Sequence, residues 1–178
     1  TEGSMTVLDM IIRKAVASEA EHLAEIGYLA WERDLRPFLN AEQQNRQAER
    51  RRLQNAVHDL LDRTIVAERD GIAVGWCARA RGKAYIPFLF VAPLSQNQGI
   101  GTLLLKRMES ILELEGCDRV QLDTLSDNVR AVNFYQHQGY QILALKHEGG
   151  QGRDPQTSVR LEKRLEPYRG PLETEQED

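Results

Sequence analysis

The sequence predicts an α/β (α+β) domain with a mixed, mostly antiparallel central sheet and helices on both of its faces. Two observations carry this prediction. Apolar runs of strand length flank an Asp70-Gly71 pair, and Asp-Gly between strands is a strong signal for an antiparallel hairpin. A single apolar stripe at helical spacing then runs through Gly99–Glu115. The expected order of elements is β-α-α-β-β-β-α-β-α-β-β.

Length and charge limit the class of protein. The 178 residues, 41% of them hydrophobic, suit one domain, which we place at residues 5–166. Residues 1–4 are interpreted as an expression-tag remnant, and residues 167–178 as an acidic, flexible tail. The four acids of Leu172–Asp178 account for the net charge of −4, so no nucleic-acid surface is expected. No apolar run approaches the roughly 20 residues of a membrane helix, so no membrane span is expected either.

The cysteines and histidines give no metal-site pattern. Cys77 and Cys117 are widely spaced, and the four histidines lack the spacing of metal ligands. We therefore expect two free thiols, a cytoplasmic location and no metal.

The first half of the chain reads as one strand and two helices. The strand is expected within Thr6–Ala15. Ser18 stands three residues before Glu21, which is the spacing of a capping box at the start of a helix. Asn40 is the expected cap of a second helix over Ala41–Asp62.

A third antiparallel strand is expected over Ala84–Val91, after the hairpin. Pro87 lies inside it and cannot donate a ladder hydrogen bond, so the strand pairing must lapse there. A strand over Asp118–Leu125 and a short helix ended by Gly139 follow. The last two strands are expected at 140–146 and 157–165, joined by a loose loop.

The turn before the long helix carries the strongest chemical signal. A helix N-terminus has unpaired backbone N–H groups and a partial positive charge, and Gly99 and Gly101 let a bound group approach the backbone closely. Such a turn favours a phosphate or pyrophosphate, although a plain tight turn has the same pattern. Neighbouring side chains that can add polar contacts are Gln96, Asn97, Gln98 and Thr102.

Two common phosphate-binding motifs do not fit this turn. A Walker A loop needs a lysine before Thr102, where Gly101 stands instead. A Rossmann turn needs a third glycine where Leu104 stands, and it opens a parallel unit, whereas antiparallel strands precede this turn.

The stretch FLFVAPLSQNQGIGTLLLKRME resembles the cofactor motif of the GNAT superfamily of N-acetyltransferases. Its Gln96-x-x-Gly99-x-Gly101 spacing matches that motif. Downstream, LDTLSDNVRAVNFYQHQGY is similar to the second GNAT motif, which is carried here by Asn128, Ala131, Tyr135, Gly139 and Tyr140. The resemblance covers roughly residues 11–165.

This resemblance implies acetyl-CoA as the cofactor and assigns residues to it. The pyrophosphate would lie on the turn, and the pantetheine arm would run beside the strand that precedes it. Asn128 would cap the next helix and face that arm, and the Tyr135 hydroxyl would point at the sulfur as the catalytic acid. The residues assigned to the cofactor besides Asn128 are Leu89, Phe90, Val91, Gln96, Asn97, Gln98, Gly99, Ile100, Gly101 and Thr102.

The implied function is transfer of an acetyl group from acetyl-CoA to a primary amine of a small molecule or peptide, directly within a ternary complex. An acyl-CoA-binding regulatory or sensor domain is the alternative, and an unrelated α+β interaction protein is a weaker one. A homodimer is possible, since the last strands often mediate dimers in this family.

The general base is left open, because the strand Ala84–Val91 has no acidic residue, whereas many relatives place one there. Asp123, Glu32, Asp34 or a water chain are the candidates. A weak base suffices more easily for an amine of low pKa, so we expect an α-amine or similar acceptor. Tyr28, Trp31 and Phe38, with Arg33 or Arg36, either wall the acceptor pocket or pack the first helix on the sheet.

Overall fold

A computed structural model gives the structure of the chain and describes residues 10–148 and 156–171. Its helices are α1 (Ala20–Asp34), α2 (Arg46–Asp59), α3 (Ile100–Leu114) and α4 (Val129–His137). Its strands are β1 (Met10–Lys14), β2 (Thr64–Arg69), β3 (Ile72–Ala78), β4 (Phe88–Val91), β5 (Arg119–Leu125), β6 (Gln141–Glu148) and β7 (Gln156–Arg164). The order of these elements is the expected one.

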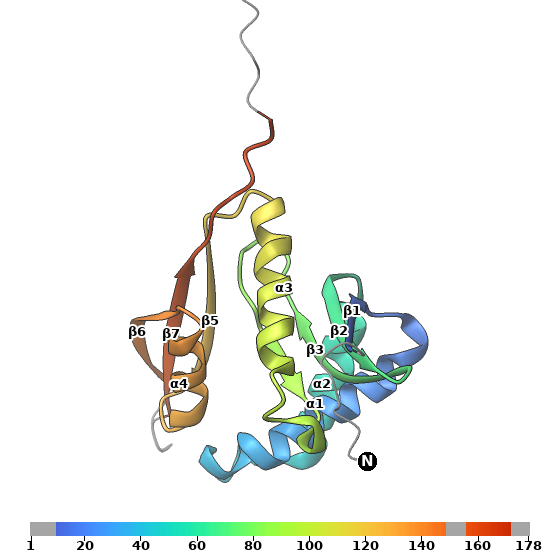
Figure 1. Ribbon diagram of the computed structural model, residues 1–178. Coiled ribbons are helices and arrows are strands. Elements are labelled where there is room, and N and C mark those ends of the chain that lie inside the picture. Colours follow the sequence, from blue (N-terminus) through green and yellow to red (C-terminus); the bar gives the residue numbers. More distant parts are fainter. Residues whose placement is uncertain (1–9, 149–155, 172–178) are drawn as a thin grey trace, which may run out of the picture.

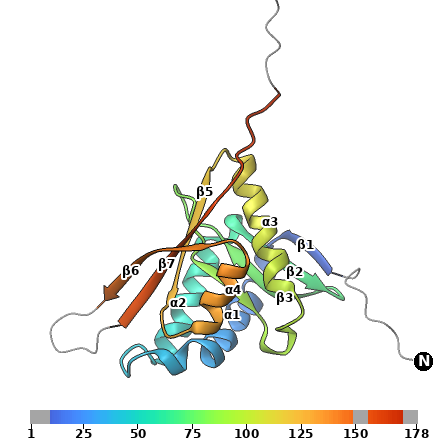
Figure 2. The same cartoon turned by 60° about the vertical axis from the view of Figure 1, so that its left-hand side comes forward.

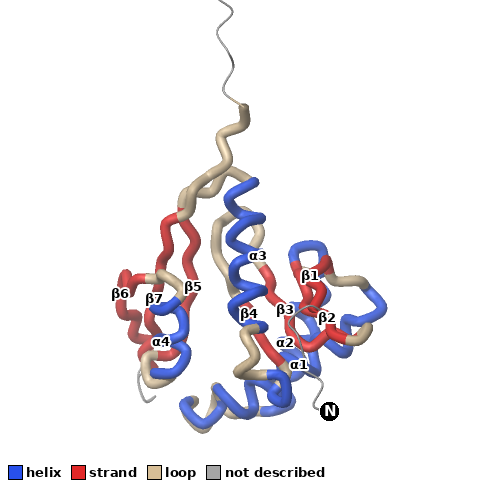
Figure 3. The backbone as a smooth tube through the Cα atoms, in the orientation of Figure 1, coloured by secondary structure: helices blue, strands red, loops and turns tan. Residues whose placement is uncertain are grey.

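The strands form two antiparallel sheets, in the orders β1-β2-β3-β4 and β5-β7-β6. The two groups of strands lie on either side of α3 (Figures 1 and 3). One parallel bridge between Tyr85 and Gln121 connects them: the Ile86 N–H donates to the Gln121 carbonyl and the Gln121 N–H to the Ala84 carbonyl, both at 3.0 Å. The mixed, mostly antiparallel arrangement is confirmed, and the sheet opens between β4 and β5.

Two apolar clusters hold the layers together. One cluster joins α3 to β2, β3, β5 and β7, and its members include Leu104, Met108 and Leu161. The other joins α1 and α2 to β2, β3 and β4, around Leu23, Leu53 and Trp76. Helices therefore cover both faces of the sheet, as predicted. The β6–β7 hairpin and α4 are best seen in the turned view of Figure 2.

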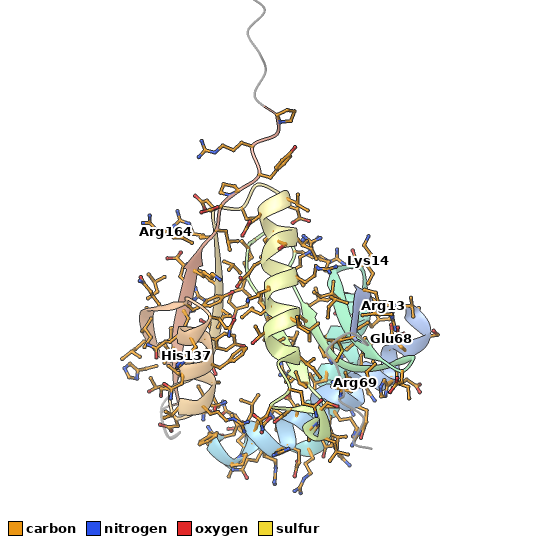
Figure 4. All side chains as sticks on the ribbon, viewed as in Figure 1. Arg13, Lys14, Glu68, Arg69, His137 and Arg164 are labelled. Carbon is orange, nitrogen blue, oxygen red and sulfur yellow. The ribbon has the colours of Figure 1, made fainter. Side chains whose placement is uncertain are left out.

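Charge pairs tie β1, the outer strand of the first sheet, to its neighbours. Arg13 of β1 donates from its Nε to the Glu68 carboxylate of β2 at 3.3 Å, and the two side chains lie together in Figure 4. Arg13 also makes two hydrogen bonds to the Glu19 carboxylate, at 2.8 and 2.9 Å. These pairs lie on the side of α3 opposite to His137 of α4.

The start of α1 differs from the prediction. Ser18 is not the cap: Ala17–Glu19 form a 3-10 turn, and the Glu19 carboxylate accepts the Val16 N–H at 2.8 Å. Glu19 is held there by Arg13, which is an interaction between segments that a local spacing rule does not detect.

The start of α2 also differs. Asn40 accepts the Gln43 N–H at 2.9 Å and caps only a turn. The helix begins at Arg46, where Asn45 accepts the Ala48 N–H at 3.0 Å, and it ends at Asp59. Both asparagines have cap geometry, and only the second is followed by residues that continue as a helix.

The strand around Pro87 is shorter than expected. The ladder between β3 and β4 starts at the pair Ala78–Phe88, so Pro87 lies just outside it, and Tyr85 joins the other sheet instead. The lapse in pairing at Pro87 is therefore confirmed.

Some expectations concern residues outside the described ranges. These are the start of the expected first strand, most of the expected loop between the last two strands, and the end of the acidic tail. Within the described ranges, no helix has both the length and the apolar character needed to cross a membrane. The same residues contain no group of three or more His, Cys, Asp or Glu side chains placed to hold a metal ion.

At Gly75 of β3, the backbone of β4 and a side chain of α3 approach closely. Replacing this glycine tests how tightly β3 packs against them. A Cβ added there would lie 2.9 Å from the Phe90 carbonyl oxygen and 3.2 Å from Leu104 Cδ1. Gly75→Ala must therefore push β4 or α3 outward, and we expect it to lower the free energy of unfolding by about 1–3 kcal/mol in urea denaturation.

Gly101→Ala is the matched control for this change. A Cβ at Gly101 would meet Phe134 Cζ at 3.6 Å, which is ordinary contact. The control should leave the stability unchanged or slightly higher, because alanine favours a helix over glycine by roughly 1 kcal/mol. Equal stability of the Gly75→Ala variant and the unsubstituted protein would show that the contact between β3 and β4 is looser than described.

Candidate active site

A cavity of about 1400 Å³ lies where β4 and β5 separate. Its walls come from β4, the turn before α3, the end of β5 and the inner side of α4, and α1, α2 and their connection close one end. Of the residues assigned to a cofactor or to catalysis from sequence, all but Gln98 line it: Leu89, Phe90, Val91, Gln96, Asn97, Gly99, Ile100, Gly101, Thr102, Asn128 and Tyr135.

One edge of β4 is left without a strand partner along the cavity. Ala92 N–H donates to the Val74 carbonyl, and β4 pairs with β3 in the same register. Because hydrogen-bonded pairs alternate along an antiparallel ladder, Phe88 and Phe90 bond to β3, and the N–H groups of Leu89 and Val91 face the opening. These groups can bond to an extended ligand, or to an oxygen that gains negative charge.

The glycine turn presents a row of free backbone N–H groups. Gly99 caps α3 in the left-handed conformation, with φ of 79°. No described residue accepts a hydrogen bond from the N–H groups of residues 97–102, and the first helical bond is from Leu103 N–H to the Gly99 carbonyl. Unpaired N–H groups at the start of a fifteen-residue helix, facing a cavity, fit a phosphate or diphosphate.

The side chain of Gln96 holds the turn in place. Its Nε2 donates to the Asp34 carboxylate at 2.8 Å and to the Val91 carbonyl at 3.2 Å, which ties the turn to the end of α1 and to β4. The amide group expected to contact a ligand is therefore engaged within the protein, and the backbone of the turn remains available.

The next two side chains of the turn are engaged by arginines. Asn97 accepts a short hydrogen bond from Arg130 of α4. Gln98 accepts from Arg69 of β2 at 2.6 Å, which draws it away from the cavity. Sequence reasoning did not single out Arg130, which lines the cavity beside the turn. Its place between Asn128 and Ala131 in the second motif was the available signal.

Helix α4 carries Tyr135 into the cavity. Asn128 accepts the Ala131 N–H at 3.2 Å and so caps α4, as predicted, while Gly139 leaves the helix with φ of 93°. The Tyr135 ring packs edge-on against Phe134 and Tyr140, and no described residue bonds to its hydroxyl. Burial raises the pKa of Tyr135, so this phenol keeps its proton well above neutral pH.

Asp123, a candidate base, lies in a charged cluster on β5. Arg160 donates to both of its carboxylate oxygens at 2.9 Å, and the Tyr85 hydroxyl donates at 2.9 Å. Partial burial acts to raise the pKa of Asp123, but these hydrogen bonds outweigh it and hold that pKa below the ordinary value. Burial and the bond to Asp123 raise the pKa of Tyr85 to about 12. Asp123 is therefore a weak base.

The other two candidate bases are also engaged. Glu32 does not line the cavity: Arg46 and Arg36 bond to it, and the Arg46 bonds lower its pKa. Asp34 does line the cavity, and it accepts the hydrogen bond from Gln96. No carboxylate that sequence reasoning put forward is thus free of a donor.

The aromatic residues in the second half of α1 and just after it divide between the core and the cavity. Tyr28 is buried in the core beneath Arg50, whereas Trp31 and Phe38 line the cavity. The Phe38 carbonyl accepts from Gln156 of β7 at 2.7 Å, so the connection after α1 reaches across to the second sheet. Arg33 lines the cavity, while Arg36 is turned to Glu32.

Helix α2 contributes a charge pair to the wall of the cavity. Glu49 and Arg52 line the cavity and are joined by two hydrogen bonds, at 2.9 and 2.6 Å. The Arg52 guanidinium lies 5.3 Å from the ring centre of Phe88, at the start of β4. From sequence, the run Glu49–Arg52 is open to two interpretations, a solvated helix face or a rim that attracts an acidic substrate or partner.

A comparison with protein families decides the classification. The model of the acetyltransferase (GNAT) family matches residues 21–140, which is more than half of the chain. The chain belongs to the GNAT family. This match spans α1 to the end of α4, and it therefore includes both the glycine turn and Tyr135.

Curated relatives match over shorter stretches. The uncharacterized protein YdhI of Bacillus subtilis is 46% identical over 87 residues, which are 49% of this chain and 54% of YdhI. The thialysine N-epsilon-acetyltransferase of Mus musculus is 34% identical over 68 residues, 38% of each chain. The chain thus aligns with about half or less of the length of these relatives.

Solved structures agree on the fold across nearly the whole chain. A GCN5-related N-acetyltransferase from Rhodopseudomonas palustris covers 92% of this chain and 100% of its own, with a TM-score of 0.73 and 23% identity. The PaiA N-acetyltransferase of Thermoplasma acidophilum, solved in complex with coenzyme A, covers 88% and 99%, with a TM-score of 0.69 and 20% identity. Identity at this level supports the shared fold alone.

Proposed function

We propose that this GNAT protein is an N-acetyltransferase that moves an acetyl group from acetyl-CoA to a primary amine, directly within a ternary complex. The observation that carries the proposal is the cavity between β4 and β5, which joins the free N–H groups of the Gly99 turn to the Tyr135 phenol. The complex of PaiA with coenzyme A supports the choice of donor.

The residues of the cavity fit the diphosphate, the arm and the thioester of acetyl-CoA. The N–H groups of residues 97–102 suit its diphosphate, and the free edge of β4 suits its amide-containing arm. Because the Leu89 N–H faces the opening, it can donate to the thioester oxygen as that oxygen gains negative charge. Leu89, Val91 and the turn would hold the donor in line with Tyr135.

Tyr135 has the properties of the acid in this reaction. Its hydroxyl is not used by the described protein, and its raised pKa keeps it protonated at the pH of the reaction. When the neutral amine attacks the carbonyl carbon, a carbon–nitrogen bond forms and the nitrogen releases one proton to water. When the carbon–sulfur bond breaks, the sulfur takes the electron pair, and Tyr135 would give it a proton. The phenolate is then reprotonated from solvent.

The acceptor proposed is an α-amine or another amine of low pKa. Asp123 and Glu32 are both held by arginines that favour their charged forms, so neither is a strong base. At pH 7, removing the proton from an α-amine of pKa about 8 costs roughly 1 kcal/mol, against about 4–5 kcal/mol for a lysine amine of pKa about 10.4. Water suffices as the proton acceptor more easily in the first case.

Two matched peptides test this proposal. One has a free N-terminal α-amine and no lysine, and the other has a blocked N-terminus and one lysine in an otherwise identical sequence. With acetyl-CoA at pH 7.5, thiol release should give a kcat/KM about tenfold or more higher for the α-amine peptide. Its rate should rise with pH up to about 8 and then level off, since the neutral amine reacts.

Three outcomes would count against parts of the proposal. A preference for the lysine peptide would reject the low-pKa acceptor and leave acetyl transfer intact. Thiol release at the same rate with and without amine would reject the transfer. Absence of coenzyme A binding in calorimetry at millimolar concentration would reject the donor site itself.

A further inference from the structure

Glu109 is a charged residue in the apolar core, on the buried side of α3. It is 5% exposed, and the proposed reaction does not use it. Its carboxylate accepts one hydrogen bond from the Tyr140 hydroxyl and one from the Lys163 ammonium of β7, each at 2.8 Å. Tyr140 is 2% exposed. We call these three residues the Glu109 network.

Stability alone is a poor reason for such a network. Removing a carboxylate and an ammonium from water costs free energy that their attraction only partly offsets. Well-packed apolar side chains of similar volume at the same places are often as stable or more stable. The geometry around Tyr140 indicates what the network achieves.

Tyr140 is the direct neighbour of Tyr135. The two rings meet edge-to-face with their centres 5.7 Å apart, and the Tyr140 N–H donates to the Tyr135 carbonyl at 3.0 Å. Between them in the chain, Gly139 turns the backbone over the Lys163 side chain, whose Cε lies 3.4 Å from the position of an added Cβ. The network therefore fixes the ring that supports Tyr135 and the turn that follows it.

Helix α4 needs such support because its own packing is slight. It has nine residues, and none of them is fully buried. Its first turn is tied to the glycine turn by Arg130 and Asn97, and Gln138, just after its end, donates to Thr102 at 3.3 Å. Among the described residues, the Glu109 network is what links the Tyr135 end of α4 to the core through charged groups.

We propose that Glu109, Tyr140 and Lys163 are positioning residues that set the place of the Tyr135 hydroxyl in the cavity. This inference builds on the proposed function, in which Tyr135 is the acid. The network joins α3, the turn between α4 and β6, and β7. The helix that begins at the glycine turn therefore also determines where the proton donor lies.

A pH profile separates positioning from stability. The titratable groups that face Tyr135 are Cys77 of β3, Tyr85 before β4, and Tyr140 with Glu109 and Lys163 behind it. Because burial raises the pKa of Tyr135, kcat of the unsubstituted enzyme should not fall as the pH rises to about 10. If the network is broken and water reaches Tyr135, its pKa drops towards the ordinary value of about 10 and an alkaline decline appears.

The test compares Glu109→Gln and Tyr140→Phe with Glu115→Gln as a matched control. Glu115 follows the last residue of α3 and pairs with Arg79, so the control breaks an ion pair of the same helix away from the cavity. We expect kcat to fall between about tenfold and about 100-fold in the two network variants, with the KM for acetyl-CoA within about twofold. The control should keep kcat and the pH profile unchanged.

A double-substitution cycle keeps the inference distinct from the proposed function. In a Tyr135→Phe background, Glu109→Gln should cause no further loss of kcat, because it acts only through Tyr135. Additive losses, or an unchanged kcat in both network variants at a temperature where they are folded, would overturn the positioning role. Full activity of Tyr135→Phe alone would instead reject the acid role and with it the basis of this inference.

Discussion

Replacing Tyr135 by phenylalanine is expected to lower kcat by about 100-fold, the size of effect typical of losing a positioned acid. The change removes one oxygen atom and leaves the ring against Phe134 and Tyr140, whose ring centres lie 5.1 and 5.7 Å away. Thiol release at saturating acetyl-CoA and amine measures the effect. The free energy of unfolding should change little, since no described residue bonds to the lost hydroxyl.

The binding of coenzyme A provides the control for this variant. Calorimetry should give the same dissociation constant for the variant and the unsubstituted protein, because the turn and the edge of β4 are untouched. A kcat reduced less than about threefold would show that water protonates the leaving thiolate. In that case α4 serves to close the cavity, and Tyr135 is one of its wall residues.

Trp76→Ala should be the most destabilising single truncation in the core. Trp76 of β3 is 0% exposed, and its Nε1–H donates to the Leu23 carbonyl of α1 at 2.8 Å. Its ring also lies against Phe88 and Phe90 of β4, with centres 5.6 and 5.3 Å apart. We expect the free energy of unfolding to fall by about 3–5 kcal/mol in urea denaturation, against a typical total of about 5–15 kcal/mol.

Leu94→Ala is the control for the loss of an apolar side chain. Leu94 is 97% exposed, so its truncation should change the free energy of unfolding by no more than about 0.5 kcal/mol. A loss below about 1 kcal/mol for Trp76→Ala would mean that α1 and β4 close readily over the space left by the ring.

The architecture was predictable because local patterns agree with it. The apolar stripe of Gly99–Glu115 became α3, and Asp70-Gly71 became the β2–β3 hairpin. Pro87 indicated where a strand had to lose its partner, and β4 begins directly after it. Each of these signals depends on residues close together in the chain, which is what sequence periodicity can detect.

The start of α1 and the hydrogen-bond partners of the candidate bases depend on residues that are distant in the sequence. The Glu19 carboxylate accepts the Val16 N–H before α1 because Arg13 of β1 holds it in place. The spacing between Ser18 and Glu21 cannot predict that interaction. Asp123 appeared available as a base, yet Arg160, 37 positions away, pairs with it. The chemistry of a carboxylate is set by the partners that folding brings. The position of the glycine turn at the start of α3 could therefore be predicted from sequence, whereas the general base could not.

Among the described residues, backbone hydrogen bonds cross from one sheet to the other only at Gln121, which bonds to Ala84 and Ile86. The two sheets can therefore separate about this single connection, and a ligand bound between β4 and β5 would hold them together. When the concentration of free ligand is 100 times its dissociation constant, binding adds about 2.7 kcal/mol to the free energy of unfolding. The lifetime of this protein in a cell would then follow the supply of its thioester, with proteases removing the copies that stay empty.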